Sequence, residues 1–323
     1  MQPINLIVSC TNRKKAVVPD QLRLRSLTGE SLSQRLEEWL HRLTTHDTPQ
    51  RRAADLYAGD HWQTAQAIPR EAAEGDLDVR MWICSAGYGL IRPSDRLKPY
   101  SATFAARHPD SVTLSASGEA NGSAAREWWL SLSAHSPTRG APRSLAELAA
   151  QDPRVPVVLV ASESYIQAMG SDLVGAAKTL ASQDLLSILS IGADPKRLPQ
   201  LKAHLLPADA RFEAVVGGTR AALNARVARL LFRRVLNGAR LSKELLSSTL
   251  TQLAVELPPL RRFNRRRLSD NEVRRFIENE RRADPPVYKT RILRRLRASG
   301  AACEQNRFSE IFNQAVEESS DGT

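Results

Sequence analysis

The sequence predicts an α/β fold, with helices flanking a mainly parallel central sheet, followed by an all-α basic domain. Over residues 1–237, short apolar β-branched segments alternate with helix-like segments, which is typical of β-α-β units and a parallel sheet. Over residues 238–323, no strand-like segment follows, and basic helical segments take their place. We therefore expect the 323-residue chain to form two domains, 1–237 and 238–323.

Each element of the first domain is predicted from its apolar pattern. Short runs of buried type predict strands over residues 4–9, 79–84, 155–161, 185–191 and 212–216. Apolar side chains that recur every three or four residues, such as Leu32, Leu36 and Leu43, predict amphipathic helices. These helices are expected over residues 30–45, 51–57, 61–73, 121–135, 162–182 and 220–237.

The second domain is expected to consist of four helices, over residues 241–257, 269–283, 289–299 and 304–317. Ser269 followed three positions later by Glu272 has the form of a capping box and marks a helix start. Proline pairs at 258–259 and 285–286 end two of the helices, because proline cannot continue the hydrogen-bonded ladder.

The positive charge is concentrated near the C-terminal end. The chain has a formal net charge of +11, yet residues 1–219 hold 24 Lys+Arg against 23 Asp+Glu, and residues 220–323 hold 22 against 12. This asymmetry predicts a domain that grips phosphates without reading sequence; the alternative is a solvated, arginine-rich helical surface. The expected contacts are Arg261, Arg262, Arg265, Arg266, Arg267, Arg274, Arg275, Arg294, Arg295 and Arg297.

Several classes of protein are not indicated. The sequence has no run of 18 apolar residues, and its first residues lack the pattern of a secretory signal, so we expect a cytoplasmic protein without membrane contact. Cys10, Cys84 and Cys303 are too far apart for a zinc site or a disulfide framework. The six histidines form no metal-ligand spacing either, and we expect no metal and no other cofactor.

Polar loops at residues 9–15, 85–91, 162–165 and 217–219 follow the predicted strands, and we expect them to converge on one pocket, because the carboxyl ends of parallel strands meet at one edge of a sheet. The first loop offers Ser9, Thr11, Asn12 and Lys14, whose short polar and ammonium groups suit an anion or a sugar. The alternative is an ordinary polar turn with solvated lysines.

A second loop carries Ser85, Gly87, Tyr88 and Gly89. Two glycines let the backbone approach a ligand, and the tyrosine between them can present a flat face to a planar base. In the alternative interpretation, the tyrosine packs inward from a tight turn. Further along, Tyr100 and Phe104 are candidates to complete a base-binding pocket.

Two carboxylates are candidates for catalysis. Asp110 lies in an irregular segment, and Glu163 directly follows the clearest predicted strand, where α/β enzymes often hold a catalytic group. The alternative for Glu163 is an acid favoured by the dipole at the first turn of a helix.

The order of these motifs resembles a bacterial superfamily that includes YaaA-like proteins. The motifs are Ser-Cys-Thr-Asn-Arg-Lys-Lys at 9–15, Leu-Tyr-Ala-Gly-Asp-His-Trp at 56–62, Ser-Ala-Gly-Tyr-Gly-Leu-Ile at 85–91, Pro-Tyr-Ser-Ala-Thr-Phe at 99–104 and Pro-Asp-Ser-Val at 109–112. The resemblance covers residues 3–235 and implies a core similar to the uracil-DNA-glycosylase fold. With the segments 293–300 and 302–308, the chain also resembles the Brig group of anti-phage DNA glycosylases. It lacks the Gly-Gln-Asp-Pro-Tyr and His-Pro-Ser sequences of the usual glycosylases.

The resemblance implies a DNA glycosylase that flips out a modified base of phage DNA, hydrolyses its N-glycosidic bond and leaves an abasic site. Its partners would be duplex DNA, held through phosphates, and the base in the pocket. Asp110 or Glu163 would stabilise positive charge on the sugar, and Asn12, Lys14 or Lys15 negative charge on the leaving base. Two alternatives stay open: a base-exchanging transglycosylase or deoxyribosyltransferase of a nucleic-acid modification pathway, and a non-enzymatic nucleic-acid-binding sensor.

Overall fold

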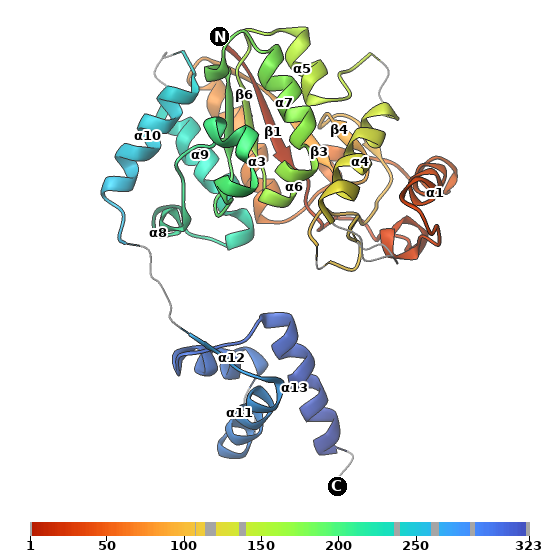
Figure 1. The fold of residues 1–323 in the computed structure, drawn as a ribbon, viewed down its shortest axis with the longest axis vertical. Coiled ribbons are helices and arrows are strands. Elements are labelled where there is room, and N and C mark those ends of the chain that lie inside the picture. The colour runs from red at the N-terminus through yellow and green to blue at the C-terminus, as the bar shows by residue number, and fades with distance from the viewer. Residues whose placement is uncertain are drawn as a thin grey trace. The chain divides into compact units, whose positions relative to one another are not determined.

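The computed structural model describes residues 2–106, 108–113, 121–135, 140–235, 240–259, 265–284 and 288–320. The chain divides into two compact units, Met1–Pro258 and Pro259–Thr323, which we call the α/β unit and the C-terminal unit (Figure 1).

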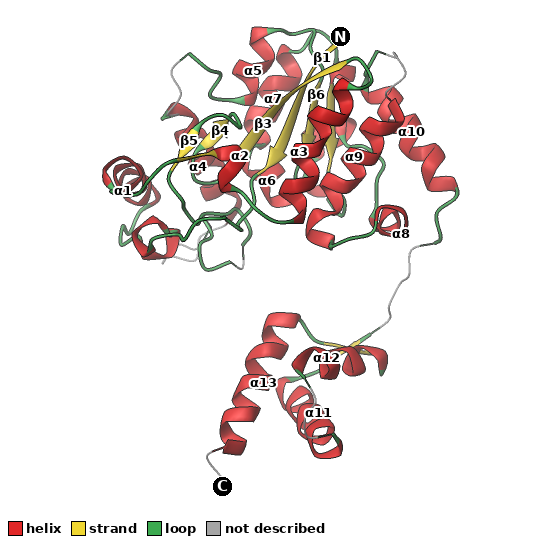
Figure 2. Ribbon diagram, turned by 180° about the vertical axis from the view of Figure 1, so that it is seen from behind, coloured by secondary structure: helices red, strands yellow, loops and turns green. Residues whose placement is uncertain are grey.

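A five-stranded sheet with the order β4-β3-β1-β6-β7 forms the centre of the α/β unit (Figure 2). Strands β3, β1, β6 and β7 run parallel, and the short edge strand β4 pairs antiparallel with β3. The strands are β1 (Gln2–Ser9), β3 (Leu77–Ser85), β4 (Gly89–Ile91), β6 (Val157–Val160) and β7 (Leu186–Leu189). The prediction of an α/β fold with a mainly parallel sheet is confirmed.

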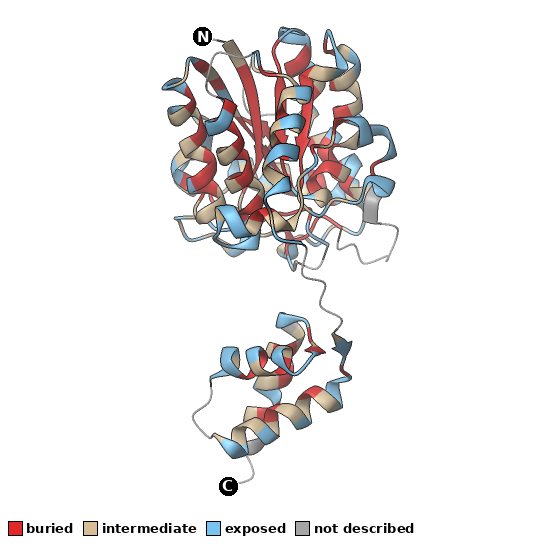
Figure 3. Ribbon diagram, turned by 90° about the vertical axis from the view of Figure 1, so that its left-hand side faces the viewer, coloured by how far each residue is buried: buried red, intermediate tan, exposed pale blue. Residues whose placement is uncertain are grey.

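Helices cover both faces of this sheet, whose strands are buried on both sides (Figures 1–3). On one face α3 packs against α9, and on the other α4, α5 and α6 contact α7. The helices are α1 (Leu32–Thr45), α2 (Ala53–Leu56), α3 (Asp60–Ala73), α4 (Asn121–Ala134), α5 (Leu145–Gln151), α6 (Glu163–Ala168), α7 (Gly170–Thr179), α8 (Glu213–Val216), α9 (Leu223–Val235) and α10 (Lys243–Val255). A two-residue ladder, β2 (Arg51–Arg52) with β5 (Arg96–Leu97), lies outside the main sheet.

Two predictions about the fold are wrong, namely the boundary between the domains and the strand at residues 212–216. The units divide at Pro258–Pro259 and not at residue 237, because Leu246 and Leu250 of α10 are fully buried in the core of the α/β unit. Residues 212–216 form a helical turn and α8 instead of a strand. There the Asp209 side chain accepts a hydrogen bond from the Arg211 amide and starts the turn, and Val215 is exposed.

In the described part of the C-terminal unit, three helices pack around an apolar core that includes Val273, Ile277, Ile292, Leu296 and Phe308. The helices are α11 (Asp270–Ala283), α12 (Lys289–Ala298) and α13 (Gln305–Ser320). The predicted capping box of Ser269 and Glu272 is present at the start of α11. A two-residue parallel ladder between β8 (Arg266–Arg267) and β9 (Ala301–Ala302) adds to the predicted helices. In the part of the chain that the structure describes, no helix is both long and apolar enough to span a membrane.

Candidate functional site

Polar side chains from three loops and from the last residue of β3 meet beyond the carboxyl ends of β1 and β3. The two strands are adjacent and parallel, with Ser9 of β1 opposite Cys84 of β3, so the loops that follow them start side by side. We call the group the β1–β3 cluster; it consists of Asn12, Lys14, Tyr57, Ser85, Tyr100, Ser101, His108 and Asp110. Of the four loops expected to converge on one pocket, those after β1 and β3 contribute to this cluster, whereas residues 217–219 follow the helix α8 and not a strand.

Buried hydroxyl groups form the inner part of the cluster. The Oη atoms of Tyr57 and Tyr100 lie 2.8 Å apart, and Tyr100 Oη lies 2.5 Å from Ser85 Oγ. The amides of Gly87 and Tyr88 both donate to Ser85 Oγ, each at 3.1 Å. The Ser85 oxygen therefore fixes the loop after β3 while its proton remains available to Tyr100.

The ammonium of Lys14 lies above these rings. Nζ is 4.4 Å from the ring centroid of Tyr100 and 5.1 Å from that of Tyr57. It donates to the carbonyl oxygens of Thr11 at 2.6 Å and Asn12 at 3.3 Å. Burial lowers the pKa of Lys14 to about 8, because the charged form loses hydration that the ring faces and carbonyls replace only in part.

Asp110 is fully buried and held as a carboxylate. Arg25 donates to it through Nε at 2.8 Å, Nη2 at 2.7 Å and its backbone amide at 3.1 Å, and Ser101 Oγ donates at 2.6 Å. Burial alone would raise the pKa of Asp110, but these hydrogen bonds outweigh it and lower the pKa to about 2. With four donors on its two oxygens, Asp110 positions the loops around it.

Asn12 and His108 form the outer, solvent-facing part of the cluster. Asn12 Nδ2 lies 2.8 Å from His108 Nε2, and Asn12 Oδ1 lies 3.2 Å from Ser101 Oγ. Burial lowers the pKa of His108; the nearby Asp110 opposes this shift, and Arg25 and Lys14 add to it. The ring is therefore neutral near pH 7. Its Nδ1 accepts from the Asp110 amide at 3.0 Å, which leaves Nε2 as the ring nitrogen that faces Asn12.

The predicted base-stacking surfaces need correction. Tyr100 and Phe104 are buried, and Phe104 packs edge-on against Trp129 and Tyr165, so neither ring offers a free face to a base. Tyr88 is only 9% exposed, and its hydroxyl bonds the backbone of Lys98. The uncovered part of Tyr88 lines a pocket of about 280 Å³ beside leucines of α1 and α4. The sequence could not show which way these rings turn.

Glu163 is placed as the alternative interpretation expected, at the first turn of α6. Its carboxylate pairs with Arg197 at 3.0 Å and accepts from Gln167 at 2.8 Å and from the Asp194 amide at 3.0 Å. These contacts join α6 to the segment after β7. The expectation that Glu163 shares a catalytic site with Asp110 is not supported, since none of these partners belongs to the β1–β3 cluster.

The remaining residues predicted to bind substrate support the loops. Thr11 Oγ1 donates to the Ala58 carbonyl at 3.0 Å, and the Ser9 carbonyl accepts from His61 Nε2 at 3.1 Å, which ties the loop after β1 to the start of α3. At Gly87, a Cβ atom would lie 2.4 Å from the Tyr100 ring, so a side chain is excluded. Gly89 has a φ of +74° where the chain turns into β4.

Sequence reasoning gave no role to Arg25, Tyr57 or His108. Tyr57 stands in the motif at residues 56–62, which could have indicated it. Arg25 and His108 carried no local signal, because their partners Asp110 and Asn12 lie 85 and 96 residues away in the sequence. Cys10 is buried, with its Sγ 3.3 Å from Tyr165 Oη.

The predicted phosphate-binding arginines fall into different environments. Arg261 and Arg262 lie outside the described residues. Arg266 pairs with Glu272 at 2.8 Å, and Arg295 pairs with Glu280 at 2.6 Å, so their charges are partly used within the C-terminal unit. Arg274 Nη2 lies 3.5 Å from Gln314 Oε1. Among the described residues, no carboxylate forms an ion pair with Arg267, Arg275, Arg294 or Arg297.

Comparison with known proteins gives no functional assignment: no family model matches the chain, and no curated protein matches it significantly. Within the described ranges, no three His, Cys, Asp or Glu side chains gather closely enough to hold a metal ion.

Proposed function

We propose that the chain is a DNA glycosylase that excises a modified base, with a role in defence against phages. The α/β unit would hydrolyse the N-glycosidic bond of an extruded nucleotide and leave an abasic site, and the C-terminal unit would hold the DNA backbone. The observation that carries the proposal is the β1–β3 cluster, in which an exposed amide, a neutral imidazole and a buried ammonium come together at the ligand-binding edge of a parallel sheet.

This set of groups suits a departing base. As the N-glycosidic bond breaks, the base gains negative charge and the sugar gains positive charge. Asn12 is exposed and can donate to the base through its amide, and the imidazole of His108 lies beside it, with Nε2 2.8 Å from Asn12 Nδ2. Lys14 adds positive charge behind the loop backbone. Fixed donors of this kind stabilise a developing anion without having to reorganise.

The state of the two carboxylates favours water over a second base as the group that captures the sugar. Asp110 is saturated by four donors, and Glu163 is paired with Arg197. Neither is arranged as the nucleophile that a covalent base-exchange mechanism would need. We therefore place hydrolysis before the transglycosylase alternative. The buried, ionised Asp110 orients Ser101 and the loop that carries His108.

An alkali assay tests the proposal. The full chain is incubated with a set of labelled duplexes, each carrying one modified base, and with the matched unmodified duplexes, and then treated with alkali. Strand breaks that depend on the modified base and on Asn12 are the expected result. Incorporation of a labelled free base without breaks would indicate base exchange. Tight binding of the DNA without either reaction would indicate a sensor and would refute the proposed enzymatic activity.

A further inference from the structure

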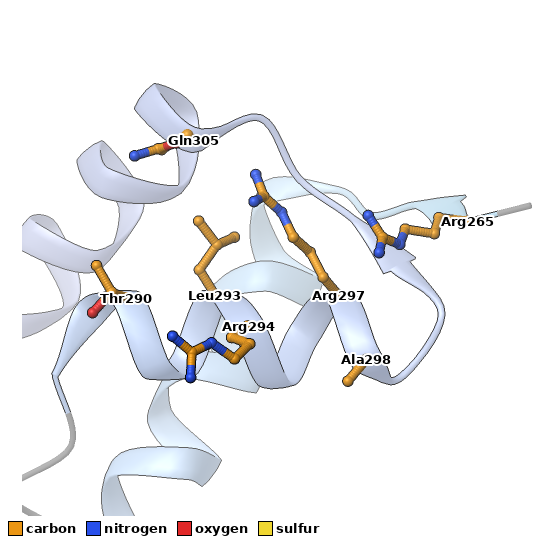
Figure 4. A pocket seen from close by; sticks show the side chains of 7 residues that line it. All are labelled: Arg265, Thr290, Leu293, Arg294, Arg297, Ala298 and Gln305. Carbon is orange, nitrogen blue, oxygen red and sulfur yellow. The ribbon is translucent and has the colours of Figure 1, made fainter. Parts of the chain in front are cut away.

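One face of α12 lines a pocket of about 460 Å³ in the C-terminal unit (Figure 4). Thr290, Leu293, Arg294 and Arg297 have the spacing i, i+3, i+4 and i+7, which places them along one side of a helix. Arg265, from the segment before β8, and Gln305, from the start of α13, complete the wall. The opposite side of α12 is anchored in the core through Ile292 and Leu296, both fully buried.

The arginines of α12 are divided between two roles. On the core side, Arg295 pairs with Glu280 and Asp284, and Arg291 lies 3.7 Å from Asp284. On the pocket side, Arg294 and Arg297 form no ion pair with a described carboxylate, and none of the described residues that line the pocket is Asp or Glu. A pocket whose only charged groups are guanidiniums has a positive potential and attracts an anion.

A second pocket of about 440 Å³ on the same unit gives an internal comparison. It is lined by Arg266 and Arg275, but also by Glu272, which pairs with Arg266 at 2.8 Å. The sequence places many arginines on this unit, and in its described part Arg294 and Arg297 of the α12 pocket form no ion pair with a carboxylate. A high density of arginines in the sequence is therefore not enough to explain why the first pocket lacks a carboxylate.

The shape and lining of the α12 pocket suit one unit of a nucleic-acid backbone. Its volume is in the range of pockets that hold small organic ligands, and larger than a single inorganic anion needs. Leu293 and Ala298 provide apolar surface for a sugar, and the planar guanidinium groups can each donate two parallel hydrogen bonds to a phosphate. Tyr288, at the start of α12, is 81% exposed, as an aromatic ring available to a neighbouring nucleotide would be.

We propose that this pocket binds a phosphodiester of DNA, with Arg294 and Arg297 as the gripping residues. The inference rests on the proposed function and narrows it: one face of α12, and not the whole basic segment, makes the contact that anchors the backbone.

The test compares two double variants of the full chain. Arg294→Ala with Arg297→Ala removes the pocket arginines; Arg234→Ala with Arg282→Ala removes two exposed arginines outside it and gives the same change in charge. Binding of an unmodified fluorescent duplex is measured between 50 and 200 mM salt, a range of about fourfold. The pocket variant is expected to bind more weakly, and its slope of log K against log salt to flatten by about 0.9 for each phosphate that the variant no longer neutralises. The control pair should keep the wild-type slope.

A conservative variant separates geometry from charge. Arg294→Lys with Arg297→Lys should keep the slope and still bind more weakly, because an ammonium cannot form two parallel bonds to one phosphate. Equal slopes for the wild type, the pocket variant and the control would overturn the inference while DNA binding and base excision remained intact. A wild-type protein that ignored DNA but bound phosphatidylserine vesicles through the same two arginines would overturn both the inference and the DNA-binding part of the proposed function.

Discussion

Arg25 grips Asp110 with two parallel hydrogen bonds, from Nε to Oδ1 at 2.8 Å and from Nη2 to Oδ2 at 2.7 Å. The pair joins segments 85 residues apart in the sequence. The Asp110 side chain is fully buried, whereas that of Arg25 is 47% exposed. The same carboxylate accepts from Ser101, whose hydroxyl also faces Asn12. Asp110 therefore fixes the segments that position the solvent-facing groups of the cluster, Asn12 and His108.

The Asp110→Asn variant is expected to lose stability as well as activity. The change removes a buried charge whose hydrogen bonds to charged partners are worth about 2–3 kcal/mol in all, and leaves Arg25 without its partner. Urea unfolding measures the loss. Asp20→Asn is the matched control, because its ion pair with Arg23 is exposed and worth less than about 1 kcal/mol. An Asp110→Asn protein of unchanged stability but without activity would instead assign Asp110 a direct chemical role.

The stabilisation from Asp110 should disappear in acid. Its pKa in the folded protein is about 2, below the ordinary value of 3.8, so its contribution is complete above about pH 4 and is lost as the pH falls towards 2. The free energies of unfolding of the wild type and Asp110→Asn should accordingly differ at pH 5 and approach each other near pH 2. A constant difference over this range would contradict the lowered pKa.

Lys14 should make both stability and activity depend on pH in the alkaline range. Its pKa of about 8 lies below the ordinary 10.5, so burial of the ammonium costs stability below pH 8, and this cost is relieved as the pH rises from 8 to 10.5. Activity should move the opposite way and fall above pH 8, because the positive charge near the leaving base is lost. Lys14→Arg, which stays charged, should retain more of its neutral-pH activity at pH 9; Lys15→Arg, at an exposed lysine, should behave as the wild type. Identical pH–rate profiles for all three proteins would remove Lys14 from the mechanism.

Gly87→Ala tests the packing under the cluster. The added methyl would meet the Tyr100 ring at 2.4 Å, and overpacking of this kind costs about 1–3 kcal/mol. It should also displace the Ser85 hydroxyl that bonds Tyr100. Gly170→Ala, at the start of α7 where no atom lies within 4 Å of the new Cβ, should be neutral or slightly stabilising. Thermal unfolding of both variants gives the comparison, and a Gly87→Ala protein as stable as Gly170→Ala would contradict the described packing.

The backbone of this protein was easier to predict than its site. The short apolar, β-branched segments of β1 and β6 are typical of buried strands. The capping box at Ser269 depends only on residues close to it in the sequence. Both features could therefore be predicted from local sequence. Residues 212–216 were equally apolar, but a capped turn at Asp209 decided their helical form.

The site depended on contacts that no local pattern encodes. Tyr88 between two glycines fits an exposed ring and a packed ring equally well, and only the position of Lys98 and Tyr100 turns it inward. Glu163 follows a strand as a catalytic acid would, yet Arg197 neutralises it from a segment 34 residues later. The roles of Arg25 and His108 could be recognised only from the structure, because their partners are distant in the sequence.

The most direct test of the central claim is the release of free base. The full chain is incubated with duplex DNA containing modified bases, and the small molecules are quantified by mass spectrometry beside an Asn12→Ala protein that binds the same DNA. We expect the wild type to release the modified base with one abasic site formed for each molecule released, and Asn12→Ala to release at least tenfold less, the effect of losing about 1.4 kcal/mol of transition-state stabilisation. DNA bound tightly by both proteins, with no base released from any modified substrate, would contradict the assignment as a glycosylase.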